Sequence, residues 1–188
     1  MINKANRVAG LLFNSFKHID LNCFRNLYCV FVRPLLEYGS VVWYPTKIKD
    51  VDAIERVQRK TTKKAPGLRN YSYEERLRLL QLPTLEERRY RGDLIHIFKI
   101  IRGFVDVRWA NAIKSKHQDL IGPKTRGHKL QYNKESFKDS NRMNFFVNRV
   151  ANNWNSLPEN IVMAENVNQF KAQLDIQFKL KGTYNFSK

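Results

Sequence analysis

Cysteine and long apolar runs are both scarce in this sequence of 188 residues, and each shortage excludes a class of protein. Cys23 and Cys29 are the only cysteines, which are too few for a disulfide framework and wrongly spaced for a zinc site. We therefore expect buried, reduced thiols. The longest apolar stretch, 27–44, is interrupted by charged residues and a proline, so no membrane span is expected. The first residues are polar and form no signal peptide, which favours a nuclear or cytoplasmic protein over a secreted one.

Catalytic motifs are missing as well. No two aspartates are adjacent, whereas polymerases need carboxylates that converge on Mg²⁺. No phosphate-binding glycine loop and no His-Glu-x-x-His motif occurs. Asp93 and His96 lie one helical turn apart, which usually indicates a structural pair, and Glu86 and Glu87 precede two arginines with which salt bridges are expected. The sequence therefore predicts no enzyme, no catalytic or metal-ligating residue, no cofactor and no small-molecule substrate.

Acidic residues are few relative to basic ones. The sequence has 34 Lys and Arg and 17 Asp and Glu, which gives a net charge of +17. Such an excess costs self-repulsion in the compact state, and a polyanion relieves it. Nucleic acid is the commonest polyanion that basic proteins bind. A basic protein-docking surface and an anionic membrane surface are the alternatives.

Hydrophobic spacing predicts a mainly α-helical chain. A short first helix is expected from the spacing of Leu11, Leu12 and Phe16, and a second helix, capped by Asp20, has Leu27, Val30 and Phe31 on one side. Pro34 should bend or interrupt the second of these helices. Ser72 with Glu75, and Thr84 with Glu87, form capping-box patterns that begin two later helices.

The segment 47–65 has the most informative pattern. One narrow arc of its helical wheel holds Val51, Ile54, Gln58, Thr61 and Ala65, and the far side holds Arg56, Arg59, Lys60, Lys63 and Lys64. Nearly all of its acids lie in the first turns, where they suit the helix dipole. A dense cationic stripe beside a weak apolar one indicates contact with backbone phosphates, and a solvated face is the alternative.

The next long helix, expected to end near 102, repeats this arrangement. Its core stripe holds Tyr90, Leu94, Ile97, Phe98 and Ile101, and a separate stripe of cations without acidic partners holds Arg88, Arg91, Lys99 and Arg102. Because each of these two helices has one apolar face and one basic face, we expect the two helices to form a shared groove.

Periodicity is lost over 103–142, where the charge stays positive and a long connection with one short strand pair is expected. This connection is the best candidate for a loop that is mobile or ordered by RNA. Two C-terminal helices follow, with core faces made by Phe146, Val150 and Trp154, and, after Pro158, by Val167, Phe170, Leu174 and Phe178. The chain thus divides into a helical domain, 1–104, a basic irregular connection, 105–142, and a C-terminal helical segment, 143–182.

Several stretches of the sequence, taken together, are similar to a known protein family. They are Tyr28–Ser40, Val42–Pro45, Ile54–Lys60, Pro66–Arg69, Tyr73–Leu77, Leu82–Arg89, Arg91–Leu94, Thr125–His128, Phe145–Val150 and Trp154–Pro158. In order and spacing, the sequence resembles the thumb and post-thumb region that follows the polymerase core in non-LTR (LINE-type, CR1/jockey-like) retrotransposon reverse transcriptases. The similarity covers roughly residues 5 to 180.

The resemblance implies a thumb-like helical bundle and a C-terminal segment that contacts template RNA and the RNA–DNA hybrid. No position matches the palm aspartates, so polymerase activity is not carried over, and a truncated product is expected, with a separate reverse-transcriptase core as a possible partner. The family's palm-docking face would then be exposed, around Val41 to Tyr44. Lys64 and Ala65 stand where the family has larger apolar residues, which puts the packing of that helix end in doubt.

Two functional hypotheses remain open. The first is a truncated reverse-transcriptase-derived protein that binds the backbone of RNA or of an RNA–DNA hybrid. The cations chosen for this contact are Arg56, Arg59, Lys60, Lys63, Arg88, Arg91 and Arg126. Tyr71 and Trp43 either add stacking to bases or belong to the core. The second hypothesis is a helical protein-interaction module or an inert retrotransposon fragment.

Overall fold

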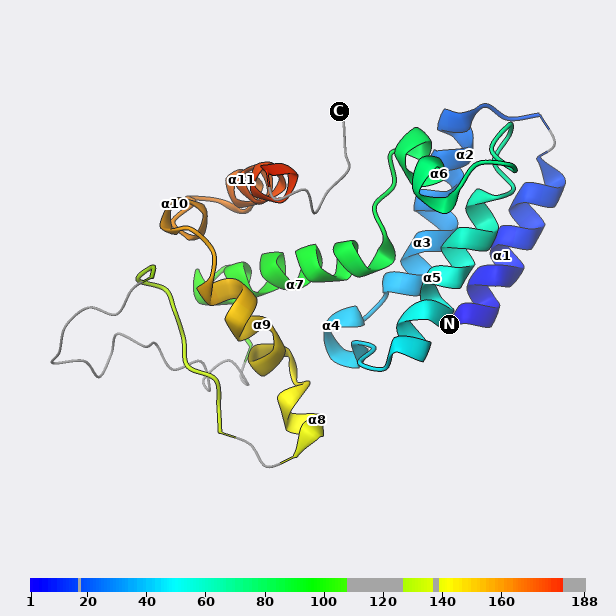
Figure 1. Ribbon diagram of the computed structural model, residues 1–188. Helices are drawn as coiled ribbons and strands as arrows, with labels where there is room; N and C mark the ends of the chain where they lie inside the picture. Colours follow the sequence, from blue (N-terminus) through cyan, green and yellow to red (C-terminus); the bar gives the residue numbers. More distant parts are fainter. Residues whose placement is uncertain (17, 108–126, 137–138, 181–188) are drawn as a thin grey trace, which may run out of the picture. The chain divides into compact units, whose positions relative to one another are not determined.

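A computed structural model describes residues 1–16, 18–107, 127–136 and 139–180, and these residues are mainly helical, as predicted (Figure 1). By its internal contacts the chain forms two compact units, whose described residues lie within 1–89 and 90–180. The three-part division of the sequence at 104 and 142 stays a prediction.

The first unit is built from short helices and one π-helix. Its elements are α1 (Ile2–Ser15), α2 (Leu21–Leu27), η1 (Tyr28–Val32), α3 (Arg33–Glu37), α4 (Ser40–Trp43), α5 (Ile48–Thr62), α6 (Tyr73–Leu80) and the start of α7 (Leu85–Ile101). Helix α1 packs against α5, against η1 and against α3, and Figure 1 shows α1, α3 and α5 side by side. Helix α5 therefore lies against its neighbours along one face and has another face open to solvent.

The buried faces of the first helices do not contain most of the residues whose spacing predicted these helices. Leu11 is 65% exposed and Val30 is 63% exposed, and Phe16 and Phe31 are also exposed. The buried residues are instead Ala5 and Ala9 of α1, and Phe24, Tyr28, Val32 and Leu36 along α2, η1 and α3. Small alanines let α1 approach its neighbours closely, so the larger residues on its other faces are not needed in the core. The spacing of Leu11, Phe16, Val30 and Phe31 thus predicted helices here, but these four side chains do not form the buried faces of those helices.

The predicted interruption at Pro34 takes the form of the π-helix η1. The N–H of Arg33 donates to the carbonyl of Tyr28, five residues earlier. Pro34 has no N–H to donate, and it lies in the first turn of α3, where none is needed. The wider turn lets the chain pass the proline while Val32 and Leu36 stay buried on one side.

Side-chain caps begin three helices of this unit. The predicted capping boxes are both confirmed: Ser72 and Glu75 exchange hydrogen bonds of 2.8 and 3.2 Å, and Thr84 and Glu87 exchange bonds of 2.9 and 3.1 Å. The carboxylate of Asp20 accepts from the N–H of Cys23 at 2.6 Å and caps α2. Because this capping turn faces solvent, Cys23 is exposed, and the prediction of two buried thiols is wrong; both cysteines are free, as expected.

The second unit contains the rest of α7 with α8 (Ser140–Met143), α9 (Phe146–Asn155), α10 (Glu159–Val162) and α11 (Val167–Leu180). The predicted core faces are confirmed, since Leu94, Ile97, Phe98, Val150, Trp154, Phe170, Leu174 and Phe178 are buried. The rings of Phe98 and Phe170 stack with their centres 4.2 Å apart. Helices α7, α9 and α11 thus share one aromatic core.

Part of the predicted connection belongs to this core. The indole N–H of Trp154 donates to the carbonyl of Leu130 at 2.8 Å, and the hydroxyl of Tyr132 donates to the carbonyl of Val147 at 2.9 Å. Residues 127–136 are irregular, with only Tyr132 in a bridge conformation, so the strand pair is not found in this described part. Side chains of α9 satisfy the backbone here in place of a second strand.

Candidate nucleic-acid interface

Helix α5 presents a row of cations to solvent. Ile54, Val57, Gln58, Thr61 and Thr62 of this helix are buried. The cations Arg56, Arg59, Lys60, Lys63 and Lys64 are exposed. Among the residues that the structure describes, none of the five has a carboxylate within salt-bridge distance. The predicted separation of the two faces of this helix is therefore confirmed.

Arg59 has an aromatic neighbour that holds its side chain in place. Its guanidinium lies over the ring of Tyr73, 5.1 Å from the ring centre, and the guanidinium of Arg76 lies 5.6 Å from the same centre. Arg76 is buried and donates to the hydroxyl of Thr62 at 3.2 Å. Arg59 is consequently the least free of the five cations, whereas Arg56, Lys60 and Lys63 are free to meet a ligand.

The stripe predicted on α7 is not a stripe of free cations. Arg88 forms a two-bond ion pair with Glu37, in which the Nη2–Oε2 distance is 3.0 Å. Arg91 pairs with Asp175 through bonds of 2.6 and 2.8 Å. Both carboxylates come from segments far away in the sequence, so the prediction that Arg88 and Arg91 are unpaired is wrong. Arg126, the last chosen cation, lies outside the described residues.

The salt bridges predicted between neighbouring residues at the start of α7 are also wrong. Glu87 accepts from the N–H of Thr84 as part of the cap, and Arg88 pairs with Glu37. Arg89 is only 3% exposed, and its guanidinium nitrogens have no hydrogen-bond partner in the described ranges. A cap satisfies backbone N–H groups that a local salt bridge would leave unpaired, and it therefore prevails at a helix start.

A hollow of about 170 Å³ lies between α1 and α5, beside the exposed cations. It is lined by Ile2 and Asn6 of α1 and by Ala53, Arg56, Val57 and Lys60 of α5. Arg56 and Lys60 are one helical turn apart, about 6 Å along the axis. The hollow thus places two adjacent positive groups at the edge of an apolar floor.

A buried polar network lies on the inward side of the same helix, and of its members only Gln58 was placed on a core face by helical periodicity. The hydroxyl of Tyr28 donates to Gln58 at 2.5 Å, and the amide of Gln58 donates to the carbonyl of Pro83 at 2.8 Å and to the hydroxyl of Tyr73 at 3.0 Å. The Tyr73 hydroxyl in turn donates to Glu55. Burial raises the pKa values of Tyr28 and Tyr73, so both hydroxyls remain protonated donors.

Glu55 connects this network to the start of α7. Its carboxylate accepts from the N–H of Leu85 at 3.0 Å, which satisfies one of the unpaired amides at the helix N-terminus. Burial raises the pKa of Glu55, and the hydrogen bonds from Tyr73 and Leu85 and the charge of Arg89 oppose that rise. The shift is upward, so burial prevails.

The raised pKa of Glu55 predicts a pH-dependent stability. The folded protein holds this proton more tightly than the unfolded chain, so the stabilisation is full below the ordinary value of 4.5 and is lost as pH rises through the raised pKa. We expect Glu55→Gln to remove this decline, because an amide still accepts from Leu85. Urea unfolding of both proteins from pH 4 to 7 measures the difference. If the free energy of unfolding changed with pH in the same way in both proteins, the raised pKa of Glu55 would be refuted as the cause of the decline.

The remaining predicted groups have structural roles or lie at the surface. Asp93 pairs with Arg149 at 3.1 Å, and the ring of His96 contacts the edge of Phe146. Tyr71 is 46% exposed, and Trp43 is half-buried. In the described part of the chain, no three His, Cys, Asp or Glu side chains are grouped to hold a metal ion. Of the described helices, none has the length and apolar character to cross a membrane.

No family model, curated protein or solved structure matches this chain.

Proposed function

We propose that this chain binds RNA, or an RNA–DNA hybrid, through the sugar–phosphate backbone and performs no catalytic step of its own. The proposal follows the function implied by the resemblance to the region after the polymerase core of non-LTR reverse transcriptases. The cations that make the contact are Arg56 and Lys60 of α5 and Lys63, which directly follows this helix, with Arg59 beside them. Primer extension by this chain alone in the presence of Mg²⁺ would contradict the proposal.

One observation carries the proposal: the exposed cations Arg56, Lys60 and Lys63 form no salt bridge with any described carboxylate. An exposed, unpaired cation loses little solvation when it meets a phosphate, and it releases the counterions of the nucleic acid. Arg88 and Arg91 are already engaged by Glu37 and Asp175, so they are left out of the revised interface.

Charge reversal at Arg56, Lys60 and Lys63 tests the interface. We expect Arg56→Glu, Lys60→Glu and Lys63→Glu together to weaken RNA binding at least about tenfold, and to lower the slope of log affinity against log salt by about 2 to 3 units. Fluorescence anisotropy with a labelled RNA between 50 and 200 mM salt, roughly the range over which phosphate contacts are resolved, measures both quantities.

A matched control reverses three exposed cations of the second unit, Arg102, Lys129 and Lys179, which gives the same change of net charge. This control should keep most of the affinity and most of the slope. Equal losses in the two triple variants would show that net charge acts without a defined interface. Binding by the unaltered chain that does not respond to salt would refute the proposal.

A protein-interaction module is the second candidate, and exposed apolar side chains favour it. Tyr38 is 84% exposed, Val42 is 88% exposed and Ile48 is 81% exposed, and Val42 lies in the segment expected to form a docking face. Exposed apolar side chains commonly mark protein contacts where several of them adjoin. Unchanged RNA retention after the α5 reversal, together with sedimentation that depends on protein concentration, would favour this candidate.

A further inference from the structure

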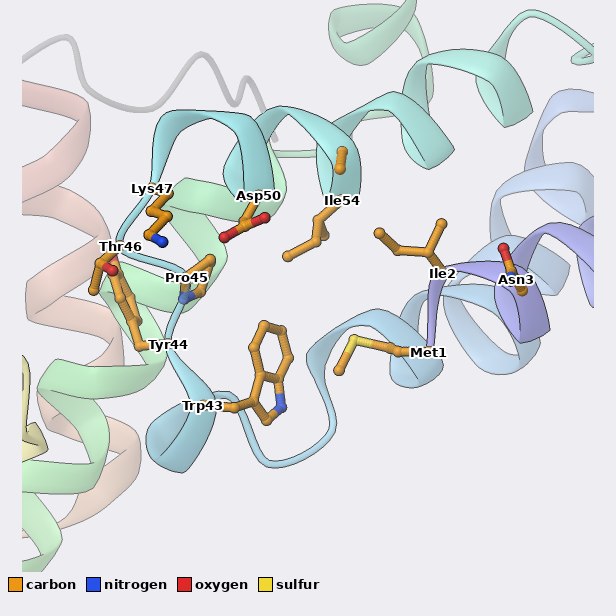
Figure 2. Close-up of a pocket in the computed structure, with 11 residues that line it drawn as sticks. Met1, Ile2, Asn3, Trp43, Tyr44, Pro45, Thr46, Lys47, Asp50 and Ile54 are labelled. Carbon is orange, nitrogen blue, oxygen red and sulfur yellow. The ribbon is translucent and has the colours of Figure 1, made fainter. Parts of the chain in front are cut away.

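A larger cavity, of about 550 Å³, lies where α1 begins, where α4 ends and where α5 begins (Figure 2). Its walls include Ile2, Trp43, Pro45 and Ile54, and polar side chains of Lys47 and Asp50 are also among its lining. Pockets of about 300–1,000 Å³ with apolar walls and a few polar groups are typical of small-ligand sites. This cavity has the size and the lining to hold a flat, partly polar group.

The indole of Trp43 is held in place within this cavity. Its N–H donates to the carbonyl of Tyr38 at 2.5 Å, and Gly39 between the two has a φ of +67°, which glycine adopts without strain. Figure 2 shows the indole pointing into the cavity, with Met1 on one side and Pro45 on the other. An aromatic ring fixed in this way is a stacking platform that requires little further ordering when a ligand arrives.

The cavity adjoins the cationic hollow on the same helix. Ile2 and Ala53 line both spaces, and Arg56 and Lys60 line the second one. A ligand whose flat group lies on Trp43 can therefore place an attached anion beside Arg56. Nucleotides combine a flat ring with an anion in this way, and single-stranded nucleic acids are commonly bound by stacking beside a positive groove.

We propose that this cavity holds one unpaired nucleobase of the RNA strand whose phosphates contact Arg56 and Lys60. The inference rests on the proposed function and adds that the preferred ligand is single-stranded at this point. Stacking on Trp43 accepts any base. The carboxylate of Asp50 is an acceptor for exocyclic amino groups, which adenine, cytosine and guanine carry, whereas uracil offers only its ring N3–H, so uracil is the least favoured base.

The test compares a short single-stranded RNA with a blunt duplex of the same sequence. Trp43→Leu is expected to weaken single-strand binding about 5- to 100-fold, the range that loss of one stacked base produces, and to leave duplex binding unchanged. Trp43→Phe should keep most of the single-strand affinity because it keeps a ring. Tyr71→Leu, which removes an exposed aromatic ring that does not line the cavity, should alter neither ligand.

Asp50 supplies a second test that does not touch the core, because this residue is exposed. The unaltered chain should bind an adenine oligomer more tightly than a uracil oligomer, and Asp50→Ala should reduce that ratio. Loss of a carboxylate raises affinity for both oligomers, so the ratio is the quantity to compare.

Different results separate the two proposals. Equal effects of Trp43→Leu on single strand and duplex, or an unchanged base ratio in Asp50→Ala, would overturn the nucleobase site and leave phosphate binding intact. If Trp43→Leu changed self-association and left RNA binding unchanged, the occupant of the cavity would be a side chain of another protein molecule. That result would also overturn the nucleobase site. If RNA binding by the unaltered chain did not depend on salt, the proposed function itself would be refuted.

Discussion

Asp93→Ala is expected to lower the free energy of unfolding by about 3–5 kcal/mol, one of the two largest stability losses expected for this chain. Asp93 is 5% exposed, and its carboxylate accepts two bonds from Arg149, of 3.1 and 3.2 Å. Removal of the acid leaves the guanidinium of Arg149 charged in a largely buried position beside the ring of Phe146. Urea unfolding, followed by circular dichroism, measures the loss.

The double variant Asp93→Leu with Arg149→Met is the matched control. Apolar residues of similar volume leave no buried charge behind, so this double variant should be markedly more stable than Asp93→Ala. A loss below about 1 kcal/mol in Asp93→Ala would show that the pair behaves like a surface salt bridge. That outcome would also mean that Arg149 reaches solvent when its partner is removed.

Local patterns were sufficient to predict some elements of the fold. The caps at Ser72 and Thr84 involve residues three positions apart, so their geometry depends only on the chain nearby. The two faces of α5 follow from helical periodicity, because its apolar residues share one side of the helix and its cations share the other. The proposed interface depends on these two faces of α5, and for this reason four of the seven predicted cations, Arg56, Arg59, Lys60 and Lys63, remain in it.

Other elements depend on partners that local patterns cannot supply. Glu37 lies 51 positions before Arg88, and Asp175 lies 84 positions after Arg91, so their pairing is fixed only when the chain is folded. The π-helix before Pro34 likewise changes which residues point inward, and a regular helical wheel places Val30 and Phe31 on the wrong side. The cavity beside Trp43 arises from three segments and has no signature in any one of them.

The distribution of acidic residues explains why positive charge is concentrated on α5. Glu75 and Glu87 serve as caps, and Glu55 is buried on the inward side of α5. Glu37 and Asp93 are engaged by arginines of other elements. These five carboxylates are held at caps, in the core or in ion pairs, so they do not neutralise the cations of α5, which are left for an external anion.

Gln58→Leu is expected to lower the free energy of unfolding by about 2–5 kcal/mol, because it leaves at least two buried polar groups without partners at about 1–3 kcal/mol each. Those groups are the hydroxyl of Tyr28 and the carbonyl of Pro83, which bond to the Gln58 amide at 2.5 and 2.8 Å. Helical periodicity placed Gln58 on the core face, but only the folded structure shows that it joins four segments. The midpoint of urea unfolding measures the loss.

The double variant Tyr28→Phe with Gln58→Leu tests whether the network is the cause. Tyr28→Phe removes the hydroxyl that Gln58→Leu would leave unpaired, so the double variant should lose less stability than the sum of the two single variants. Additive losses would contradict a direct interaction between the two side chains. RNA affinity measured in conditions where each variant stays folded should keep the unaltered salt slope, since Arg56, Lys60 and Lys63 are intact. If the slope of log RNA affinity against log salt were also lower in these less stable variants, the buried network would contribute to the position of the cations together with helical periodicity.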